Sequence, residues 1–392
     1  MIPVAEALER VLALALPLPA EPVPLARAVG RVLAEPAVAT RSQPPFAASA
    51  MDGWAVTEGA VAGDSLKIAG QSRAGERFSG KVNPGEAVRI FTGAPVPEGT
   101  ARVVMQENAE ADEDLVTLRE VSQGRNIRPE GSDFAAGFRI EAPCRLKPAD
   151  LALLAAMNVA RPMVARRPVV ALIATGDELV MPGEVPGPDQ ITASNVVALA
   201  AMAEAEGAEV RILPIARDNE AALEHVIGLA ADADLIVTIG GASVGDHDLV
   251  GKVAADMGLA RSFYKIAMRP GKPLMAGRLG ESTLLGLPGN PVSSIVCAIL
   301  FMLPLLRAMQ GLPDPAPRLH RARLAGDTPE NGPRAHYMRA RLTAGGPLPL
   351  IEPFDNQDSG ALRLLSGADA LLLRPPHDPA RKAGEEVEYL PL

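Results

Sequence analysis

Cysteine and aromatic residues are scarce in this sequence of 392 residues. Its only two cysteines, Cys144 and Cys297, are too few for a disulfide framework and have no metal-ligand spacing. Aromatic residues make up 3% of the chain, so its cores must be built from Ala, Val, Leu and Ile. The five histidines show no metal-ligand spacing, and no Ser-His-Asp set is recognisable. We therefore expect a cytoplasmic protein with reduced thiols.

Long apolar runs and excess positive charge are also missing. The longest apolar run, Ile295–Leu306, is short for a bilayer span and contains Pro304, so we expect a buried helix there. No signal-peptide pattern precedes the amphipathic start of the chain. The formal charge of −9 disfavours nonspecific nucleic-acid binding but leaves room for a local anion site. Nucleic acid and membrane are therefore not expected partners.

The order of apolar segments predicts several domains. Residues 40–139 alternate short apolar stretches with Gly and Pro turns, which predicts a β-rich domain. Residues 167–312 alternate strands with helices, which predicts a doubly wound α/β domain without a G-x-G-x-x-G or Walker A motif. The expected strands are Val169–Ala174, Val210–Ile215, Asp234–Ile239 and Thr283–Gly286. The expected helices are Ser194–Glu206, Asn219–Ala231, Asp248–Met257 and Pro291–Leu306.

Two acidic loops follow strands of the expected α/β domain. Thr175–Leu179 places Asp177 and Glu178 directly after a strand, where parallel sheets bind ligands. A helix N-cap by Thr175 or Asp177 would explain the same residues equally well. Asp218 follows another strand, and in isolation its capping of the next helix is the better explanation.

A third loop, Gly240–Asp248, is rich in glycine and acid. Its two adjacent glycines let the backbone approach a ligand, and backbone N–H groups in such turns hold phosphate. Asp246 and Asp248 could bind Mg²⁺, which prefers oxygen ligands shared with phosphate. The alternative is a flexible turn with a solvated acidic tip, which the length and the glycine pair disfavour.

Two further loops suit an anion. Lys265, Arg269 and Lys272 lie within eight residues on a segment stiffened by Pro and Gly, although solvated surface cations are the alternative. Further on, Asn290 suits a helix N-cap and Pro291 the first helical position. Free N–H groups and the helix dipole there would attract an anion, whereas a well-capped buried helix is the alternative.

A series of segments along nearly the whole chain resembles one family. They are Ser49–Val56, Thr92–Pro97, Asn126–Arg128 with Gly131 and Asp133, Thr175–Leu179, Gly240–Asp248, Pro270–Pro273 and Gly286–Ser293. Each segment alone is weak evidence. Together and in this order, the segments resemble the MoeA family, the molybdopterin molybdenumtransferases, which includes the C-terminal domain of gephyrin.

The resemblance implies an elongated homodimer with four domains per chain. Besides the β-rich domain at 40–139, it implies a helix in 1–19 that packs on the α/β domain. It also implies a linking domain from 20–39 and 140–166, and a C-terminal β-barrel-like domain at 313–392. The α/β domain would resemble molybdopterin-adenylyltransferase folds. The active site would lie near the dimer interface and use residues from both chains.

The implied activity inserts molybdate into adenylylated molybdopterin, with Mg²⁺ promoting the loss of AMP. Cations and hydrogen-bond donors suit the molybdate dianion, and tungstate would fit equally well. Carboxylates beside phosphate repel it without a cation, so an acidic cluster facing a basic one implies Mg²⁺. Molybdopterin-adenylyltransferase and molybdoenzyme-maturation proteins are further expected partners.

The resemblance also implies residue roles, carried over motif by motif. The implied catalytic residues are Asp52, Thr92, Asp133, Glu178, Asp218 and Asp248. The implied Mg²⁺ ligands are Glu178, Asp218 and Asp248. The implied substrate-binding residues are Ser243, Lys265, Arg269, Lys272, Pro288, Asn290, Pro291, Ser293, Arg339 and Ser359.

Two other functions compete with the transferase. A non-catalytic, gephyrin-like scaffold could lose Asp218, Asp248 or Lys272, and all three are present. An adenylyltransferase would need the α/β domain alone. The sequence departs from the family pattern at Arg269, where Lys is usual; Arg keeps the charge but adds a planar, forked geometry. No departure removes an implied catalytic group.

Overall fold

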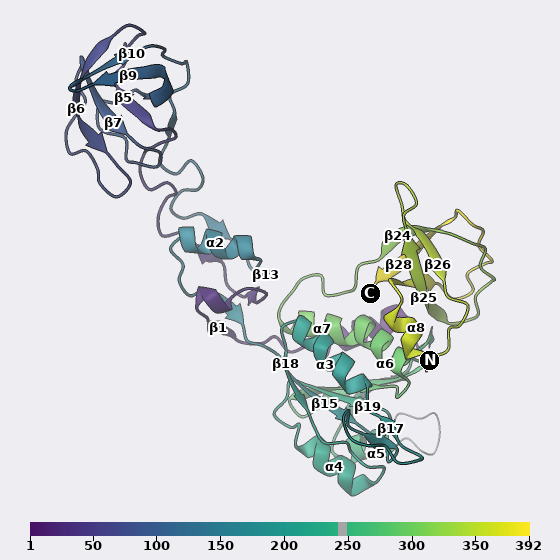
Figure 1. Cartoon of the computed structure of the whole chain (residues 1–392). Coiled ribbons are helices and arrows are strands. Elements are labelled where there is room, and N and C mark those ends of the chain that lie inside the picture. Colours follow the sequence, from purple (N-terminus) through teal and green to yellow (C-terminus); the bar gives the residue numbers. More distant parts are fainter. Residues whose placement is uncertain (242–248) are drawn as a thin grey trace.

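The computed structural model describes residues 1–241 and 249–392. The chain is elongated, with a bulky body at one end and a β-rich domain at the other (Figure 1). A slender linking part joins them, and we call the linking part and the β-rich domain together the arm. The chain enters and leaves the arm side by side, because β1 (Ala20–Pro22) pairs antiparallel with β14 (Met163–Ala165).

A six-stranded sheet forms the centre of the body, in the order β18-β15-β19-β23-β22-β20. The strands are β15 (Val169–Ala174), β18 (Glu209–Ile212), β19 (Leu235–Ile239), β20 (Ala260–Lys265), β22 (Pro273–Leu279) and β23 (Ser282–Leu287). The predicted parallel strands β15, β18, β19 and β23 are confirmed. Two antiparallel strands that the sequence did not predict, β22 and β20, extend the sheet beyond β23.

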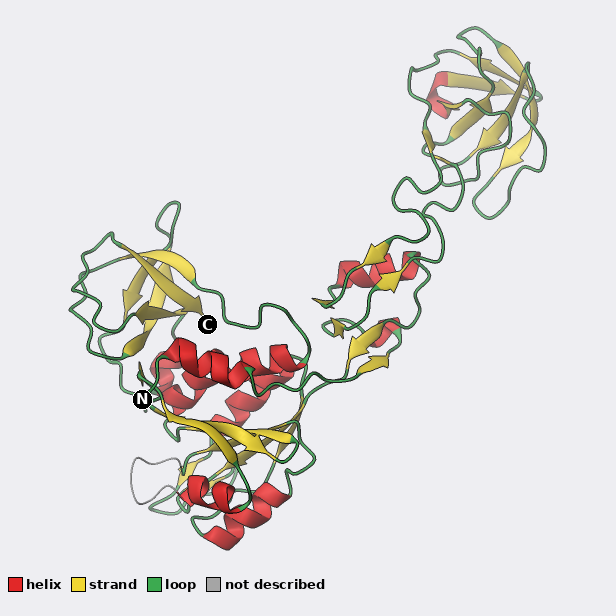
Figure 2. Cartoon of the chain, turned by 180° about the vertical axis from the view of Figure 1, so that it is seen from behind, coloured by secondary structure: helices red, strands yellow, loops and turns green. Residues whose placement is uncertain are grey.

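Helices cover both faces of this sheet, as a doubly wound fold requires (Figure 2). One core contains residues of α1, α3, α6 and α7, and the other contains residues of α4 and α5. These helices are α1 (Val4–Leu12), α3 (Asn195–Ala205), α4 (Glu220–Gly228), α5 (Leu249–Asp256), α6 (Pro291–Cys297) and α7 (Leu303–Met309). A π-helical turn at Ala298–Met302 joins α6 to α7. By length and composition Pro291–Met309 could cross a membrane, but 72% of its most apolar window is buried in the protein.

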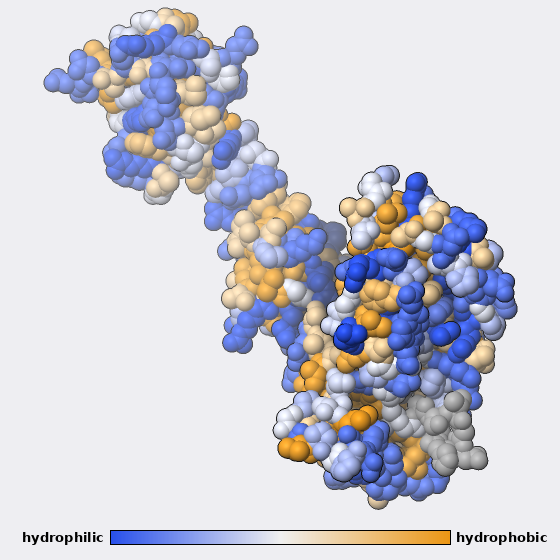
Figure 3. Space-filling view, turned by 45° about the vertical axis from the view of Figure 1, so that its right-hand side comes forward, coloured by the Kyte–Doolittle hydropathy of each residue, from blue (hydrophilic) through white to orange (hydrophobic). Residues whose placement is uncertain are grey.

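The linking part is a small four-stranded sheet with one helix. Its strands lie in the order β1-β14-β2-β13, and a second pair, β3 and β12, leads to the β-rich domain. The elements are β2 (Val32–Leu33), β3 (Ala37–Val38), β12 (Arg139–Ile140), β13 (Cys144–Arg145), α2 (Pro148–Ala156) and a 3₁₀ turn at Leu25–Arg27. Figure 3 shows apolar side chains gathered on the surface of this part, and Val29 and Val38 are 52% and 44% exposed.

The β-rich domain is built on a six-stranded sheet in the order β8-β5-β7-β6-β10-β9. The strands are β4 (Ala48–Ser49), β5 (Gly53–Val56), β6 (Ser65–Ser72), β7 (Glu86–Ile90), β8 (Arg102–Met105), β9 (Ala109–Asp112), β10 (Leu115–Leu118) and β11 (Ile127–Arg128), where β4 pairs with β11 and a 3₁₀ turn spans Gln106–Asn108. Trp54 and Val56 enter one core whereas Ala55 enters another, because successive side chains of a strand face opposite sides.

The C-terminal strands form a closed barrel, as predicted. It closes because β25 (Ala335–Thr343) pairs with β26 (Leu350–Pro353) on one side and β27 (Ala370–Arg374) on the other. The remaining elements are β24 (His320–Leu324), β28 (Glu386–Pro391) and α8 (Leu362–Ser366). Strand β21 (Met268–Arg269) of the preceding domain also pairs with β25 and attaches the barrel to the body.

A buried ion pair in the barrel gives a test of its stability. Arg374 and Asp378 expose 2% and 5% of their side chains. We expect Arg374→Met to destabilise the barrel by about 1–3 kcal/mol, because the carbonyls of Pro329 and Pro379 would lose their buried donor while Asp378 keeps its pair with Arg381. Amide hydrogen exchange in β27 and β28 should quicken accordingly. Arg323→Met is the control, since it removes a half-exposed pair with Glu386 worth about 1 kcal/mol at most. Equal exchange in the two variants would contradict the expectation.

Candidate functional site

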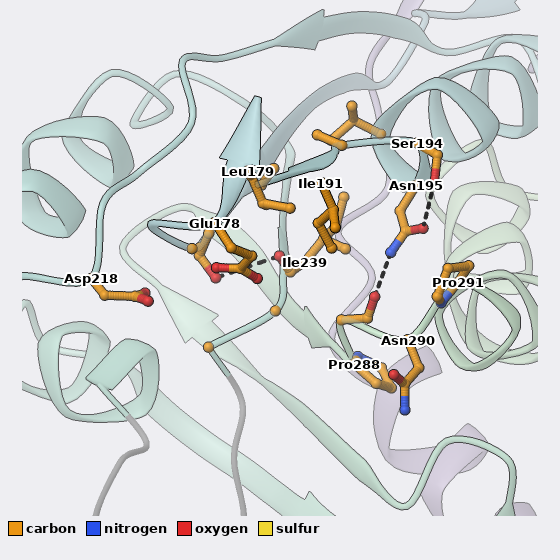
Figure 4. A pocket seen from close by; sticks show the side chains of 18 of the residues that line it. Glu178, Leu179, Ile191, Ser194, Asn195, Asp218, Ile239, Pro288, Asn290 and Pro291 are labelled. Atoms are coloured by element: carbon orange, nitrogen blue, oxygen red, sulfur yellow. Dashed lines mark hydrogen bonds between the residues drawn. The ribbon is translucent and has the colours of Figure 1, made fainter. Parts of the chain in front are cut away.

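A cavity of about 1010 Å³ opens at the carboxyl ends of the parallel strands (Figure 4). Its lining comes from the segments that follow β15, β19 and β23 and from the segment that leads into α3. The lining residues include Thr175, Gly176, Glu178, Leu179, Ile191, Asn195, Asp218, Gly240, Gly241, Lys252, Pro273, Pro288, Asn290 and Pro291. The edge of the sheet that the sequence predicted therefore does form a cavity.

Two carboxylates, Glu178 and Asp218, stand on the same side of the cavity in Figure 4. Glu178 folds back over Gly176, where a Cβ atom would lie 2.3 Å from Glu178 Oε2. Asp177 Oδ1 accepts the backbone N–H of Asp218 at 3.2 Å, which joins the two acidic loops. Across the described part of the chain, neither cavity carboxylate has a hydrogen-bond partner of its own. Both are therefore free to meet a ligand.

The helix-cap explanations of these loops are wrong. No helix follows Thr175 or Asp177, because the chain continues into the short parallel pair β16 (Leu179–Val180) and β17 (Ile191–Thr192). Helix α4 is capped by Asn219, whose Oδ1 accepts the N–H of Ala222 at 2.9 Å. Asp218 therefore does not cap α4, and its side chain points into the cavity.

The paired glycines allow the backbone to pass very close to the first loop. A Cβ atom on Gly241 would lie 2.4 Å from Val250 Cγ2 and 2.9 Å from Thr175 Oγ1. On Gly240, whose φ is +96°, it would lie 2.8 Å from the carbonyl oxygen of Thr175. Only glycine fits both positions. The expected ligands Ser243, Asp246 and Asp248 lie outside the described residues.

The start of α6 is also part of the rim, with a different cap from the predicted one. Asn290 and Pro291 occupy the N-cap and first helical positions, as predicted, but the Asn290 side chain makes no cap. Instead, Asn290 Nδ2 donates to Ser359 Oγ at 3.0 Å. The N–H of Val292 donates to the Ser359 carbonyl at 3.1 Å. The sequence predicted free N–H groups at the start of this helix, and this one is not free. The barrel thus meets the rim of the cavity through one serine.

Arg339 is buried below this serine rather than open to the cavity. It is 1% exposed, and its guanidinium donates to the carbonyls of Asn356, Asp358 and Ala361. Gln357 Oε1 accepts the backbone N–H of Arg339 at 3.0 Å, and Gln357 Nε2 donates to the Arg339 carbonyl at 3.0 Å. These bonds fix loop 356–361, which carries Ser359. Sequence reasoning missed Gln357, because its partners lie on a distant strand.

The three predicted cations lie beside the cavity rather than in its lining. Lys265 ends β20, Arg269 lies in β21, and Lys272 precedes Pro273, which does line the cavity. Ser293 is buried in α6, at 4% exposure. The expected loop at 265–273 is therefore largely a connection between strands.

Sequence reasoning also missed lining residues. Asn195, at the start of α3, donates from Nδ2 to the Gly289 carbonyl at 2.7 Å and ties the two rims together. Lys252 lines the cavity while pairing with Glu220. Ile191 is 59% exposed and gives the cavity an apolar wall. None of the three has a local pattern that would identify it.

The arm residues form a separate group. Asp52 Oδ1 accepts the N–H of Thr92 at 2.6 Å, and the Thr92 hydrogen bonds lower the pKa of the Asp52 carboxyl below its usual value. Asp133 lines a second cavity of about 580 Å³ together with Gly93 and Arg128. Figures 1 and 2 show the β-rich domain far from the α/β domain. One chain therefore does not bring these residues to Glu178.

Family models match three successive parts of the chain. They describe a MoeA N-terminal region (domain I and II) at residues 2–158 and a probable molybdopterin binding domain at residues 171–308. A MoeA C-terminal region (domain IV) matches residues 321–392. The matches follow one another in the order of the domains seen in the structure.

Curated relatives and solved structures are similar over nearly the full length. A molybdopterin molybdenumtransferase from a Nostoc species is 35% identical, over 95% of this chain and 88% of its own length. Molybdopterin molybdenumtransferase 2 from Mycobacterium tuberculosis is 38% identical over 89% of both proteins. Two structures of the molybdopterin biosynthesis MoeA protein from Pyrococcus horikoshii superpose with TM-scores of 0.85 and 0.83, at 30% and 26% identity, and cover all of this chain and 99% and 100% of theirs.

The buried arginine gives a test of the rim. We expect Arg339→Met to release loop 356–361 at a cost of about 1–3 kcal/mol, because buried carbonyls lose their donors. The Val292 amide should then exchange its hydrogen faster, since its acceptor belongs to Ser359. Arg341→Met is the control, because Arg341 lies exposed on the same strand against Phe354. An unchanged Val292 amide in Arg339→Met would refute this role of Arg339.

Proposed function

The chain belongs to the MoeA family of molybdopterin molybdenumtransferases, and we propose that it inserts molybdate into adenylylated molybdopterin with Mg²⁺-dependent release of AMP. The observation that carries the proposal is a pair of carboxylates, Glu178 and Asp218, which lie in a cavity at the ends of parallel strands and have no side-chain hydrogen bond among the described residues. At about 1010 Å³, the cavity has room for a ring system with a phosphate attached. Leu179 and Ile191 supply an apolar wall for the ring.

The donor set fits Mg²⁺, because carboxylate oxygens are its preferred protein ligands. Within residues 1–241 and 249–392, no three His, Cys, Asp or Glu side chains gather as a metal site. A metal here would therefore use Glu178, Asp218, phosphate oxygens of the substrate, and Asp248 from outside the described residues. Bound Mg²⁺ would neutralise charge on the phosphate during displacement at phosphorus. Without a cation, the two carboxylates would repel the adenylate.

We propose that molybdate binds at the rim opposite the two carboxylates. Asn290 and Ser359 place polar groups there, and Lys272 lies next to the lining residue Pro273. Lys265 and Arg269 add positive charge nearby. Arg339 acts through the loop that carries Ser359. We further propose a cytoplasmic location and encounters with molybdopterin-adenylyltransferase and molybdoenzyme-maturation proteins, which would supply the substrate and receive the product.

The proposed enzyme is a homodimer in which each arm completes the partner's cavity. Asp52, Thr92 and Asp133 need a second chain to reach carboxylates like Glu178, because their own arm extends away from the body. The body has an apolar face for this contact: Met202 of α3 lines a groove of about 860 Å³ with Ile295, Ile299 and Leu303. The linking part adds two exposed apolar side chains, Val29 and Val38.

The first test measures AMP release from adenylylated molybdopterin. We expect release that depends on Mg²⁺ and molybdate, and a loss of at least about 100-fold in Glu178→Gln and Asp218→Asn, because charge stabilisation at phosphorus would be weakened. Asp189→Asn is the control, since Asp189 is an exposed carboxylate of the nearby loop that does not line the cavity. No release by the folded, substrate-binding wild type would exclude the transferase activity.

A second test mixes two inactive chains. Asp52→Asn damages the arm and Glu178→Gln damages the cavity, so each homodimer should be inactive. After subunit exchange, half of the dimers carry one intact composite site, and activity should return to about a quarter of the wild-type value. Native mass spectrometry would verify the exchange. Verified heterodimers with no activity would show that the arm does not act on the partner.

A further inference from the structure

The arm meets the body through a narrow neck. Only two chain segments cross it, before β1 and after β14, and the N–H of Arg166 donates to the Pro19 carbonyl at 2.8 Å between them (Figure 1). A two-segment neck held only by backbone bonds would leave the arm free to bend. Side-chain contacts at two separate places connect the arm to the body.

The first contact joins Arg166 to Asp234. Arg166 Nη1 and Nη2 donate to the two oxygens of Asp234 at 2.9 and 2.7 Å. Asp234 directly precedes β19, and its Oδ2 also accepts the N–H of Val169 at 2.7 Å. Two parallel bonds between planar groups fix an orientation as well as a distance. The side chain of Asp234 is 20% exposed, so water screens this contact only in part.

The second contact centres on Glu206, at the end of α3. Arg145 of β13 donates from Nη2 to Glu206 Oε2 at 2.8 Å and from Nη1 to the Gly30 carbonyl at 3.0 Å. On the body side, Arg307 of α7 donates from Nε to Glu206 Oε1 at 2.9 Å. Gln310 Nε2 donates to the Glu206 carbonyl at 3.0 Å. One carboxylate, 14% exposed, therefore joins the linking part to two helices.

The two contacts restrain different movements. Asp234 lies at the sheet and Glu206 in the helix layer beside it, so a rotation of the arm about either contact must stretch the other. In both, the acid belongs to the body and the arginine to the arm. A competing explanation is that these pairs only add stability, as a bidentate pair within one domain does. Arg211 and Asp232 form such a pair inside the α/β domain, at 3.1 and 2.7 Å.

We propose that Glu206 and Asp234 are positioning residues that fix the direction of the arm and so deliver Asp52 and Thr92 to the partner's cavity. The catalytic consequence rests on the proposed transferase function, whereas the fixed direction of the arm does not. Neither acid lines the cavity at the strand ends, although Glu206 lines the groove proposed for the dimer contact. Each acts through an arginine of the linking part.

The direction of the arm can be measured in the full-length dimer. Leu115 of the β-rich domain and Leu229 of the α/β domain are 50% and 45% exposed. Each is replaced by a spin-labelled cysteine in a Cys144→Ser background, and the distance between the two labels is measured. Labelled chains are diluted with unlabelled chains, so that distances within one chain dominate. We expect a narrow distribution of label-to-label distances in this background. The distribution should be broader in Asp234→Asn and in Glu206→Gln, and broadest in the double variant. Asp232→Asn is the matched control and should stay narrow.

Catalysis separates positioning from stability. Misplaced arm residues should lower kcat for AMP release at least about tenfold with little change in KM for molybdate. Asp234→Glu keeps the charge, so its distance distribution should be narrower and its kcat higher than those of Asp234→Asn. Unchanged distance distributions in both single variants and the double variant would overturn the proposal. Broad distributions with unchanged kcat would show that arm direction does not serve catalysis. An inactive wild type with a narrow distribution would remove the transferase function and leave the fixed arm.

Discussion

The functional cavity depends on the parallel pairing of β15, β19 and β23. Parallel pairing brings the carboxyl ends of these strands to one edge of the sheet, so loops at Thr175, Gly240 and Pro288 meet although they are far apart in sequence. The strands are packed between helices on both faces, which holds their register against slippage. The positions of the loop ends are therefore as rigid as the sheet, and the chemistry of the site is decided by short polar segments on a fixed frame.

The cavity holds two carboxylates and two amide side chains on opposite sides, and its lining residue Lys252 pairs with Glu220, close to Asp218 in the chain. Glu178 and Asp218 stand on one side, whereas Asn195 and Asn290 stand on the other (Figure 4). A carboxylate can approach phosphate only through a cation, while a dianion needs donors or cations directly. The two halves thus suit the two steps of the proposed reaction, cleavage of an adenylate and capture of the metal oxyanion. Because Asn290 is tied to the barrel through Ser359, the C-terminal domain supports the rim of the site without lining the cavity.

The sequence predicted what local patterns determine. Continuous apolar runs indicated the buried parallel strands, and loops after them indicated Glu178 and the glycine pair. The antiparallel strands β20 and β22 were missed, because their partners are set by pairing across the sheet rather than by periodicity. Asp218 and Asn219 are adjacent potential caps, and only the folded geometry shows that Asn219 caps the helix. The burial of Arg339 depends on a loop about twenty residues away, which no local pattern reveals.

A rigid arm would bring catalytic groups to a distant cavity with a smaller loss of entropy than a closing cleft. Groups carried on a flexible segment must be ordered in every catalytic cycle, and that loss of entropy is subtracted from binding. If Glu206 and Asp234 hold the arm, the ordering happens once, during folding. A two-fold dimer then gives each cavity the partner's arm at no further cost in orientation, because the same surfaces meet twice. In the proposed dimer, the separation of Asp52 from Glu178 within one chain would follow from the use of a fixed arm in place of a moving lid.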